Sequence, residues 1–261
     1  MKRVAIIGCG AIGSELAKAI DDGLVPAQLV ALFDIKRDRC DKVASSLERV
    51  KPKVVSSMDE VLEVKPDVIV EAASQAAVAE YGPRILERGV DLIVLSVGAL
   101  LDNSVLKSLE EASRKGGGRV YAPTGAIAGL DAIRALRIVG INKVVLRTRK
   151  PPKSLGVDVN DVTVLYRGPA REAVKKYPFN VNVAAALALA AGVEPLVEIV
   201  ADPKVERNIH EIIVESAASR LTIRVENVPS PSNPRTSYLA ALSCIELVRR
   251  IVSPRWLEVG T

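Results

Sequence analysis

The sequence predicts an α/β protein in two parts: an N-terminal parallel sheet with connecting helices, then a smaller α+β domain with a mostly antiparallel sheet. In residues 1–122, short apolar runs alternate with helical patterns, as expected for strands buried on both faces of a parallel sheet. Beyond Pro123, strand patterns follow one another without regular helical crossovers, which indicates an α+β domain. The 261 residues are 49% hydrophobic and 26% charged, so the chain can bury a sizeable core.

The first part is predicted to alternate strand and helix. Continuous apolar runs predict strands at residues 4–7, 29–33, 53–56, 68–70, 92–97 and 119–121. Apolar residues at helical spacing predict helices at residues 12–20, 39–47, 58–64, 76–87 and 103–115. Pro83 is expected to kink the fourth of these helices. These elements define a first domain, residues 1–122.

The second part is predicted to be a domain of residues 123–235. Its expected strands are residues 142–149, 162–166, 196–200, 209–216 and 221–225, and its expected helices are residues 127–138 and 181–191. Prolines predict a break at residues 150–153 and a loop at residues 229–234. A last helix, residues 236–251, carries an apolar stripe, so we expect residues 236–261 to pack back on the first domain.

Charge and composition argue against several classes of partner. The net charge of +5 would permit nucleic acid, but basic and acidic residues are interleaved and aromatic residues make up only 3%, too few for a base-stacking surface. Mild basicity also suits an acidic small molecule or a phosphorylated coenzyme. No apolar run reaches the roughly 18 residues of a membrane span, and no secretory leader is recognisable. We therefore expect a cytoplasmic protein that binds neither nucleic acid nor membrane.

Cysteine and histidine are too scarce to suggest a metal site. Cys9, Cys40 and Cys244 are an odd number without close pairing, which predicts neither a disulfide framework nor a zinc site. The sequence has one histidine, His210, so a site built on several histidines is excluded. We expect no bound metal ion.

The segment GCGAIG at residues 8–13 follows the first predicted strand and opens the first predicted helix. In this setting Gly8 permits a tight turn, Gly10 lets the backbone approach a pyrophosphate, and Gly13 allows close contact between helix and strand. The backbone N–H groups of Ala11 and Ile12 begin the helix, where anions are stabilised. The alternative is an ordinary glycine turn. The position in the chain favours a Rossmann-type dinucleotide site.

Asp34 ends the second predicted strand, about 20 residues after the glycine loop, where a carboxylate can accept hydrogen bonds from both ribose hydroxyls. This position favours NAD. Lys36 and Arg37 follow immediately and could pair with a 2′-phosphate, or could simply be solvated at a helix start. We expect NAD to be preferred and NADP to be usable.

His210 lies in a predicted strand, where it shares one face with Ile212, Val214 and Ser216. A single histidine on an apolar face is often a structural residue. Its ordinary pKa near 6.5 would also allow proton transfer near neutral pH. The pattern alone leaves both interpretations open.

Six segments in order identify a resemblance. They are residues 8–13 (GCGAIG), 124–132 (TGAIAGLDA), 149–152 (RKPP), 177–185 (YPFNVNVAA), 202–210, which ends in RNIH, and 233–237 (NPRTS). Together they resemble the L-aspartate dehydrogenase family of prokaryotes, over nearly the whole chain. Arg235 stands where that family often has lysine.

The resemblance implies an oxidoreductase that converts L-aspartate to iminoaspartate, which feeds NAD synthesis or hydrolyses to oxaloacetate and ammonia. It implies that His210 is catalytic and that Ala126 and Asn182 contact the coenzyme. Asn182 could instead cap a helix, and Ala126 could serve close packing. Donors for the two substrate carboxylates are expected among the polar residues of the matching motifs, namely Lys150, Asn208, Thr236 and Ser237. Lys150 could also be a surface charge.

Two other functions stay open at this point. One is a Rossmann reductase of the dihydrodipicolinate-reductase or homoserine-dehydrogenase type, against which residues 207–210 and 233–237 argue. The other is a dinucleotide-binding sensor without catalytic turnover. Because an open sheet leaves apolar faces, we also expect a homodimer.

Overall fold

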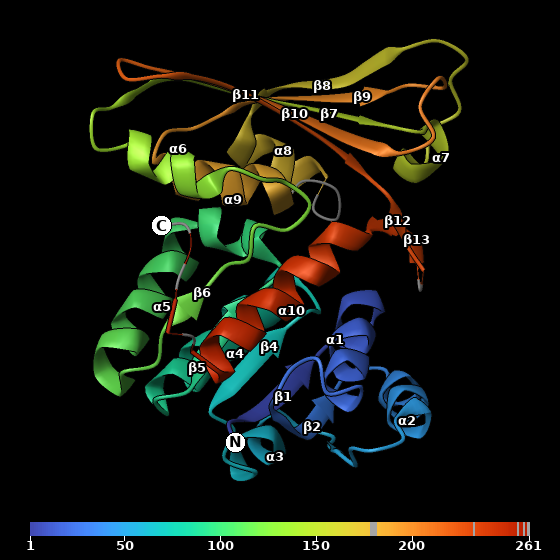
Figure 1. The fold of residues 1–261 in the computed structure, drawn as a ribbon, viewed down its shortest axis with the longest axis vertical. Coiled ribbons are helices and arrows are strands. Elements are labelled where there is room, and N and C mark those ends of the chain that lie inside the picture. Colours follow the sequence, from blue (N-terminus) through green and yellow to red (C-terminus); the bar gives the residue numbers. More distant parts are fainter. Residues whose placement is uncertain (178–181, 232, 255, 258, 260–261) are drawn as a thin grey trace. The chain divides into compact units, whose positions relative to one another are not determined.

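The structure is a computed structural model that describes residues 1–177, 182–231, 233–254, 256, 257 and 259. The chain divides into two compact units (Figure 1). The first comprises Met1–Pro123 with Ala241–Leu257, and the second is built on Thr124–Ala240.

The first unit is a parallel sheet with the strand order β3-β2-β1-β4-β5-β6. Its strands are β1 (Arg3–Ile7), β2 (Gln28–Phe33), β3 (Lys53–Val54), β4 (Val68–Glu71), β5 (Asp91–Val94) and β6 (Val120–Tyr121). Strands β2 and β3 lie on one side of β1, and strands β4, β5 and β6 lie on the other side. This reversal creates a topological switch point, where open parallel sheets bind ligands outside the carboxyl ends of their strands.

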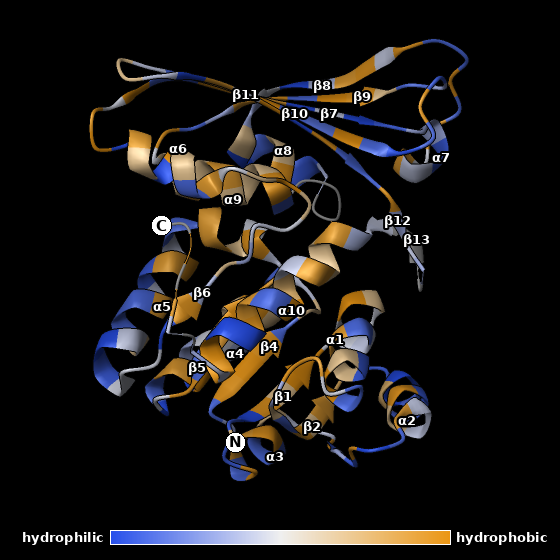
Figure 2. Ribbon diagram, viewed as in Figure 1, coloured by the Kyte–Doolittle hydropathy of each residue, from blue (hydrophilic) through white to orange (hydrophobic). Residues whose placement is uncertain are grey.

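Apolar strand residues form the core of this sheet. Val4, Ala5 and Ile6 of β1 have no exposed surface, and Figure 2 shows β1, β2 and β4 as hydrophobic. The helices are α1 (Ala11–Asp21), α2 (Arg37–Ser46), α3 (Met58–Glu63), α4 (Gln75–Glu87), η1 (Val97–Leu101) and α5 (Asn103–Gly116). The Ser57 and Ser74 side chains accept hydrogen bonds from the first turns of α3 and α4, which fixes where these helices begin. The predicted Rossmann-type parallel sheet is confirmed.

The second unit contains a five-stranded sheet with the order β11-β10-β7-β9-β8. Its strands are β7 (Ile141–Lys150), β8 (Thr163–Pro169), β9 (Leu196–Ala201), β10 (Asn208–Ser216) and β11 (Arg220–Asn227). Only β7 and β9 run parallel, so the expected mostly antiparallel sheet is confirmed. The helices are α6 (Leu130–Leu136), α7 (Pro152–Leu155), α8 (Ala170–Lys176) and α9 (Asn182–Ala191), and α8 and α9 contact strands of this sheet (Figure 1).

Several boundaries differ from the prediction. Residues 229–234 were expected to form a loop, but β12 (Pro229–Ser230) and β13 (Asn233–Ser237) form a short ribbon, with Pro229 opposite Ser237. Thr236 and Ser237 therefore belong to a strand and not to the last helix. That helix, α10 (Tyr238–Val252), begins after them, and its Cys244 and Val248 lie in the core of the first unit.

The expected break at Lys150 was also wrong. Lys150 is the last residue of β7, because its carbonyl still accepts from Asp202 N at 2.9 Å, and α7 starts only at Pro152. The expected helix 127–138 is shorter, since Gly129 precedes α6 with a φ of 76°, a conformation outside a right-handed helix. Helix α8 was not predicted, because its seven residues are too few for a clear helical period.

Among the described residues, no helix is both long and apolar enough to cross a membrane.

Candidate active site

The glycine loop at the start of α1 has the geometry that a dinucleotide pyrophosphate requires. Gly8 has a φ of +96°, and a Cβ there would lie 2.5 Å from the Ala72 carbonyl oxygen. A Cβ on Gly13 would lie 2.0 Å from the carbonyl oxygen of Gly8, so helix and strand approach each other only because both are glycines. A Cβ on Gly10 would meet no atom within 4 Å. The backbone therefore presents an open surface at Gly10.

The first turn of α1 is available to an anion. Gly10 is the N-cap residue and provides no side-chain hydrogen bond to the helix, and the first turn contains no acidic residue. The backbone N–H groups of Ala11 and Ile12 lie in this turn, as expected for a phosphate site. The residues present fit the phosphates of a dinucleotide.

Asp34 follows β2 beside this loop. Its Oδ2 accepts from the backbone N–H of Cys9 at 2.9 Å, and its Oδ1 accepts from the N–H of Lys36 at 2.8 Å. Each carboxylate oxygen can accept more than one hydrogen bond, so these contacts leave capacity for ribose hydroxyls. Asp34 thus also holds the glycine loop against the end of β2.

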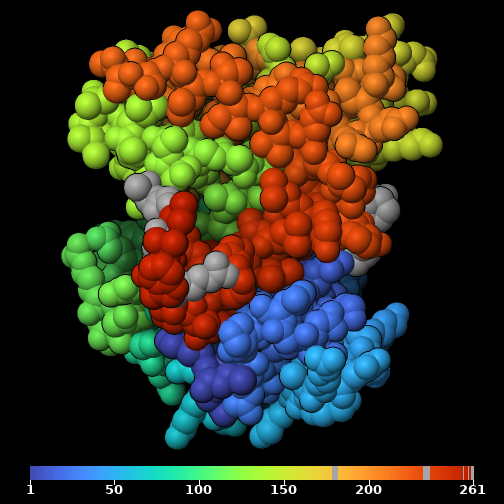
Figure 3. Space-filling model, in the orientation of Figure 1, coloured from blue at the N-terminus to red at the C-terminus, as the bar shows by residue number. Residues whose placement is uncertain are grey.

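Helix α2 lies at the surface of the first unit (Figure 3), and Lys36 and Arg37 are at its start. Both are exposed, and Arg37 already donates to Ser56 Oγ at 2.7 Å and pairs with Asp41 at 3.9 Å. These two contacts of the Arg37 side chain are exposed and contribute little energy.

A buried carboxylate that sequence reasoning missed joins two loops of the first unit. Glu71 is 1% exposed and ends β4. Its carboxylate accepts from the N–H groups of Ala73 and Ser74, each at 2.8 Å, and from both N and Oγ of Ser96, at 3.1 and 2.8 Å. Burial raises its pKa. Glu71 fixes the loops after β4 and β5 at the carboxyl edge of the sheet. In the sequence, a glutamate at the end of an otherwise apolar strand could have indicated this buried carboxylate.

In the second unit, four polar side chains lie together on the buried face of β7 and β10. They are Thr148, Lys150, Asn208 and His210, which are 1%, 6%, 8% and 3% exposed. Thr148 and His210 are opposite each other in the antiparallel register, and Thr148 Oγ1 lies 2.9 Å from His210 Nδ1. Asn208 Nδ2 donates to Ser237 Oγ at 3.4 Å. The structure therefore brings together three of the four predicted carboxylate donors, Lys150, Asn208 and Ser237, with His210.

Burial sets the charges of this cluster. The pKa of His210 is lowered to about 3, mainly by burial and to a smaller extent by the positive charge of Lys150. Burial alone lowers the pKa of Lys150 to about 8. At neutral pH the imidazole is therefore neutral and the lysine is mostly charged, which suits a site for a carboxylate. The ordinary histidine pKa, on which a titration near neutral pH was expected, does not hold in this environment.

The two residues expected to contact the coenzyme from the second unit lie in neighbouring segments. A Cβ on Gly125 would be 3.9 Å from Val183 Cγ1, so the loop that carries Ala126 passes close to the first turn of α9. Asn182 is the first residue of α9 and is partly buried. Ala126 is 6% exposed, and its carbonyl accepts from Asn227 Nδ2 at 3.1 Å.

Thr236, the fourth predicted carboxylate donor, is partly buried in β13. Residues 178–181 of the matching motif lie outside the described residues.

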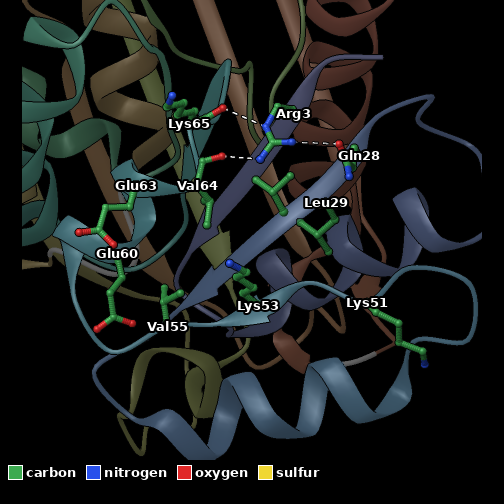
Figure 4. A pocket seen from close by; sticks show the side chains of 11 residues that line it. Arg3, Gln28, Leu29, Lys51, Lys53, Val55, Glu60, Glu63, Val64 and Lys65 are labelled. Atoms are coloured by element: carbon green, nitrogen blue, oxygen red, sulfur yellow. Dashed lines mark hydrogen bonds between the residues drawn. The ribbon is translucent and has the colours of Figure 1, made fainter.

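A groove in the first unit is not part of this site (Figure 4). It contains Arg3 and Gln28, the first residues of β1 and β2, and so lies at the amino ends of the strands. The Arg3 guanidinium is already bonded to the Lys65 carbonyl at 3.0 Å and to Gln28 Oε1 at 3.3 Å.

The glycine loop on a doubly wound sheet, joined to an α+β domain with a buried polar cluster, defines a dehydrogenase that uses a nicotinamide dinucleotide. Two family models match: one described as the NAD binding domain of homoserine dehydrogenase, over residues 8–123, and one described as the C-terminal part of aspartate dehydrogenase, over residues 131–251. The chain belongs to the aspartate dehydrogenase family, because relatives of that name are 42% identical to it over its whole length.

Similar proteins cover the whole chain. The L-aspartate dehydrogenase of Methanosarcina barkeri is 42% identical over 275 residues, which span 100% of both chains. That of Methanothermobacter thermautotrophicus is 43% identical and covers 99% of this chain and 98% of its own. The crystal structure of aspartate dehydrogenase from Thermotoga maritima matches with a TM-score of 0.75 and 29% identity, over 99% of this chain and 100% of that one. A dihydrodipicolinate reductase from Paenisporosarcina, 17% identical with a TM-score of 0.56, shares only the fold.

Proposed function

We propose that this protein catalyses the oxidative deamination of L-aspartate to iminoaspartate, with NAD preferred and NADP usable. The observation that carries this proposal is the buried cluster of Lys150, Asn208 and His210, which lies in the part of the chain matched by the aspartate dehydrogenase model. A cation and neutral hydrogen-bond donors on an otherwise apolar face suit a small dianionic substrate.

We infer separate tasks for the residues of this cluster. Charged Lys150 binds one substrate carboxylate, and the Asn208 amide with the Ser237 hydroxyl supplies neutral donors for the other. Thr236 is a further donor candidate on the same strand as Ser237. His210 contacts the substrate, either to take a proton or to hold a carboxylate. Each donor contributes more in this buried setting than it would in water.

The reaction balances with one proton and one hydride. The substrate ammonium first loses a proton, and its nitrogen lone pair then forms the C=N bond as hydride leaves Cα. When bound, the nicotinamide supplies the chemistry that accepts this hydride. Water adds to the imine and ammonia leaves, which gives oxaloacetate; otherwise iminoaspartate passes on to NAD synthesis.

The preference for NAD rests on Asp34. Two backbone N–H groups hold the Asp34 carboxylate in place, and there it attracts the ribose hydroxyls and repels a 2′-phosphate. Exposed Lys36 and Arg37 can move to pair with that phosphate, which keeps NADP usable. Gly8, Gly10, Ala11, Ile12 and Gly13 bind the pyrophosphate, and Ala126 and Asn182 contact the coenzyme from the second unit.

We also propose a cytoplasmic homodimer. The dimer is supported by the open sheet of the second unit, where the described helices α8 and α9 pack on strands β7, β8 and β9 and leave a long sheet surface for a second copy. Sedimentation of the purified protein tests the mass of the particle.

An absorbance assay of reduced nicotinamide tests the catalytic proposal. We expect turnover of aspartate with NAD, and the reverse reaction with oxaloacetate and ammonia. Alanine lacks the second carboxylate and leaves buried donors unpaired, so its kcat/KM should be lower by roughly 10⁴ or more. Equal turnover of alanine and aspartate would remove the dicarboxylate assignment. Binding of NAD without turnover of any amino acid would indicate a sensor, and turnover of another substrate alone would indicate a different reductase.

A further inference from the structure

We propose that Thr148 is a positioning residue whose hydroxyl donates to Nδ1 of His210, so that Nε2 carries the ring proton and is the nitrogen offered to the substrate. The contact joins two adjacent strands, near the carboxyl end of β7 and the amino end of β10. Thr148 on β7 is directly opposite His210 on β10, and Oγ1 and Nδ1 are 2.9 Å apart. Such directly opposed residues are the closest side-chain neighbours in an antiparallel pair.

The position of Thr148 calls for a polar partner. It continues a row of β7 in which Val144 and Leu146 are buried, and it is itself 1% exposed. Valine has nearly the same shape, so an apolar strand face would accept it without loss. A buried hydroxyl is costly unless it is hydrogen-bonded. The hydroxyl is therefore explained by the histidine opposite it.

The direction of the hydrogen bond follows from the hydroxyl proton. Among the described residues, Nδ1 of His210 is the partner recorded for the Thr148 hydroxyl. If Nδ1–H donated instead, the buried hydroxyl proton would be left without an acceptor, which is the more expensive arrangement. The hydroxyl therefore donates and Nδ1 accepts.

The neutral ring then has one remaining proton, and it lies on Nε2. Burial keeps the ring neutral, since the pKa of His210 is lowered to about 3. In this tautomer Nε2–H is a hydrogen-bond donor and has no lone pair to accept a proton. On the function proposed above, His210 thus holds a substrate carboxylate oxygen next to Lys150 and does not act as the base.

Because His210 is the one histidine of the sequence, its ring can be observed without assignment ambiguity. We would label the full-length protein with ¹⁵N-histidine and read the tautomer from the two ring nitrogen shifts at neutral pH. The expected result is a single tautomer, with Nδ1 unprotonated and Nε2 protonated. A protonated Nδ1, or a mixture of tautomers in the unchanged protein, would overturn the proposal without any variant.

Two variants separate positioning from packing. Thr148→Ser keeps the hydroxyl and should keep the tautomer. Thr148→Val keeps the shape and should give a mixture of tautomers, with kcat/KM for aspartate lowered about 10- to 100-fold and NAD affinity unchanged. Thr222→Val, the same change at an exposed position of β11, is the control and should alter neither measurement. An unchanged tautomer in Thr148→Val would overturn the proposal.

The spectroscopic result does not depend on the reaction. If the tautomer responds as expected but the unchanged protein does not turn over aspartate, the proposed function fails and the role of Thr148 stands. If aspartate is turned over but the tautomer is wrong, only the role of Thr148 fails.

Discussion

The backbone N–H of Cys9 donates to Oδ2 of Asp34 at 2.9 Å, so the carboxylate that we propose as the ribose ligand also holds the glycine loop. The other oxygen, Oδ1, accepts from Lys36 N and fixes the start of the segment that leads into α2. On the proposed function, coenzyme selectivity and loop geometry depend on one side chain, and we expect its removal to have two separable effects.

Replacing Asp34 by alanine should weaken the binding of both coenzymes, but that of NAD more. The loosened loop affects both, whereas the lost ribose contact affects NAD alone and should cost on the order of 1.5–3 kcal/mol. Calorimetric titration with NAD and with NADP measures the difference. Asp38→Ala removes the same charge at an exposed position of α2 and serves as the control. An equal loss for both coenzymes would mean that Asp34 does not bind the ribose.

The open surface at Gly10 gives a second prediction. A Cβ there meets no protein atom within 4 Å, so Gly10→Ala should change the free energy of unfolding by no more than about 1 kcal/mol. The same Cβ would occupy the place of the pyrophosphate, and the dissociation constant for NAD should rise at least about tenfold. Gly13→Ala, with its Cβ 2.0 Å from the Gly8 carbonyl oxygen, should instead lower the melting temperature sharply. Unchanged NAD affinity in Gly10→Ala would place the phosphates elsewhere.

Lys150 should make the protein more stable as the pH rises above 8. Its pKa is lowered from 10.5 to about 8 in the folded protein, so between these values the unfolded chain binds more protons than the folded one. Stability therefore increases with pH in this window, by at most about 3 kcal/mol. Lys150→Met should remove this increase and abolish binding of aspartate. Denaturant unfolding at pH 7 to 10.5 is the measurement, with exposed Lys153→Met as the control. If the free energy of unfolding rises equally with pH in Lys150→Met and in the unchanged protein, Lys150 is not a buried charge.

His210 should make the protein less stable as the pH falls below about 6.5. Its pKa is lowered from 6.5 to about 3 in the folded protein, so between these values the unfolded chain binds more protons than the folded one. The free energy of unfolding therefore decreases as the pH falls through this range. His210→Gln should reduce this acid sensitivity. It should also lower kcat/KM for aspartate by roughly 10²–10³, the cost of losing one positioned hydrogen-bond donor, with NAD affinity nearly unchanged. Because the ring is 3% exposed, His210→Ala should in addition cost a few kcal/mol of stability. Full activity of His210→Gln would make the histidine purely structural.

The sequence predicted what depends on local pattern. The glycine loop and Asp34 could be placed because the strands before each are continuous apolar runs that end at the same edge of a parallel sheet. The face of His210 could be placed because its strand alternates, and residues 210–215 are indeed buried in alternation, whereas Ser216, expected on the same face, is only partly buried after a register shift. Both results need only neighbouring residues.

Contacts between distant segments could not be predicted. Thr148 and His210 are 62 residues apart, and only the register of β7 and β10 brings them together. Cys9 and Cys40 are 31 residues apart, yet their Sγ atoms are 3.0 Å apart as free thiols. The burial of Lys150 was hidden by the two prolines that follow it, which suggested an exposed break, whereas the pairing of β7 with β9 extends the strand through this residue.

The central claim is that hydride leaves Cα of aspartate and reduces the coenzyme on this protein. The most direct measurement uses L-aspartate deuterated at Cα, with NAD, and determines the isotope in the reduced nicotinamide by mass spectrometry. The account predicts one deuterium in each reduced coenzyme, together with equal amounts of ammonia and oxaloacetate after hydrolysis. Absence of reduction, or reduced coenzyme without deuterium, would contradict it.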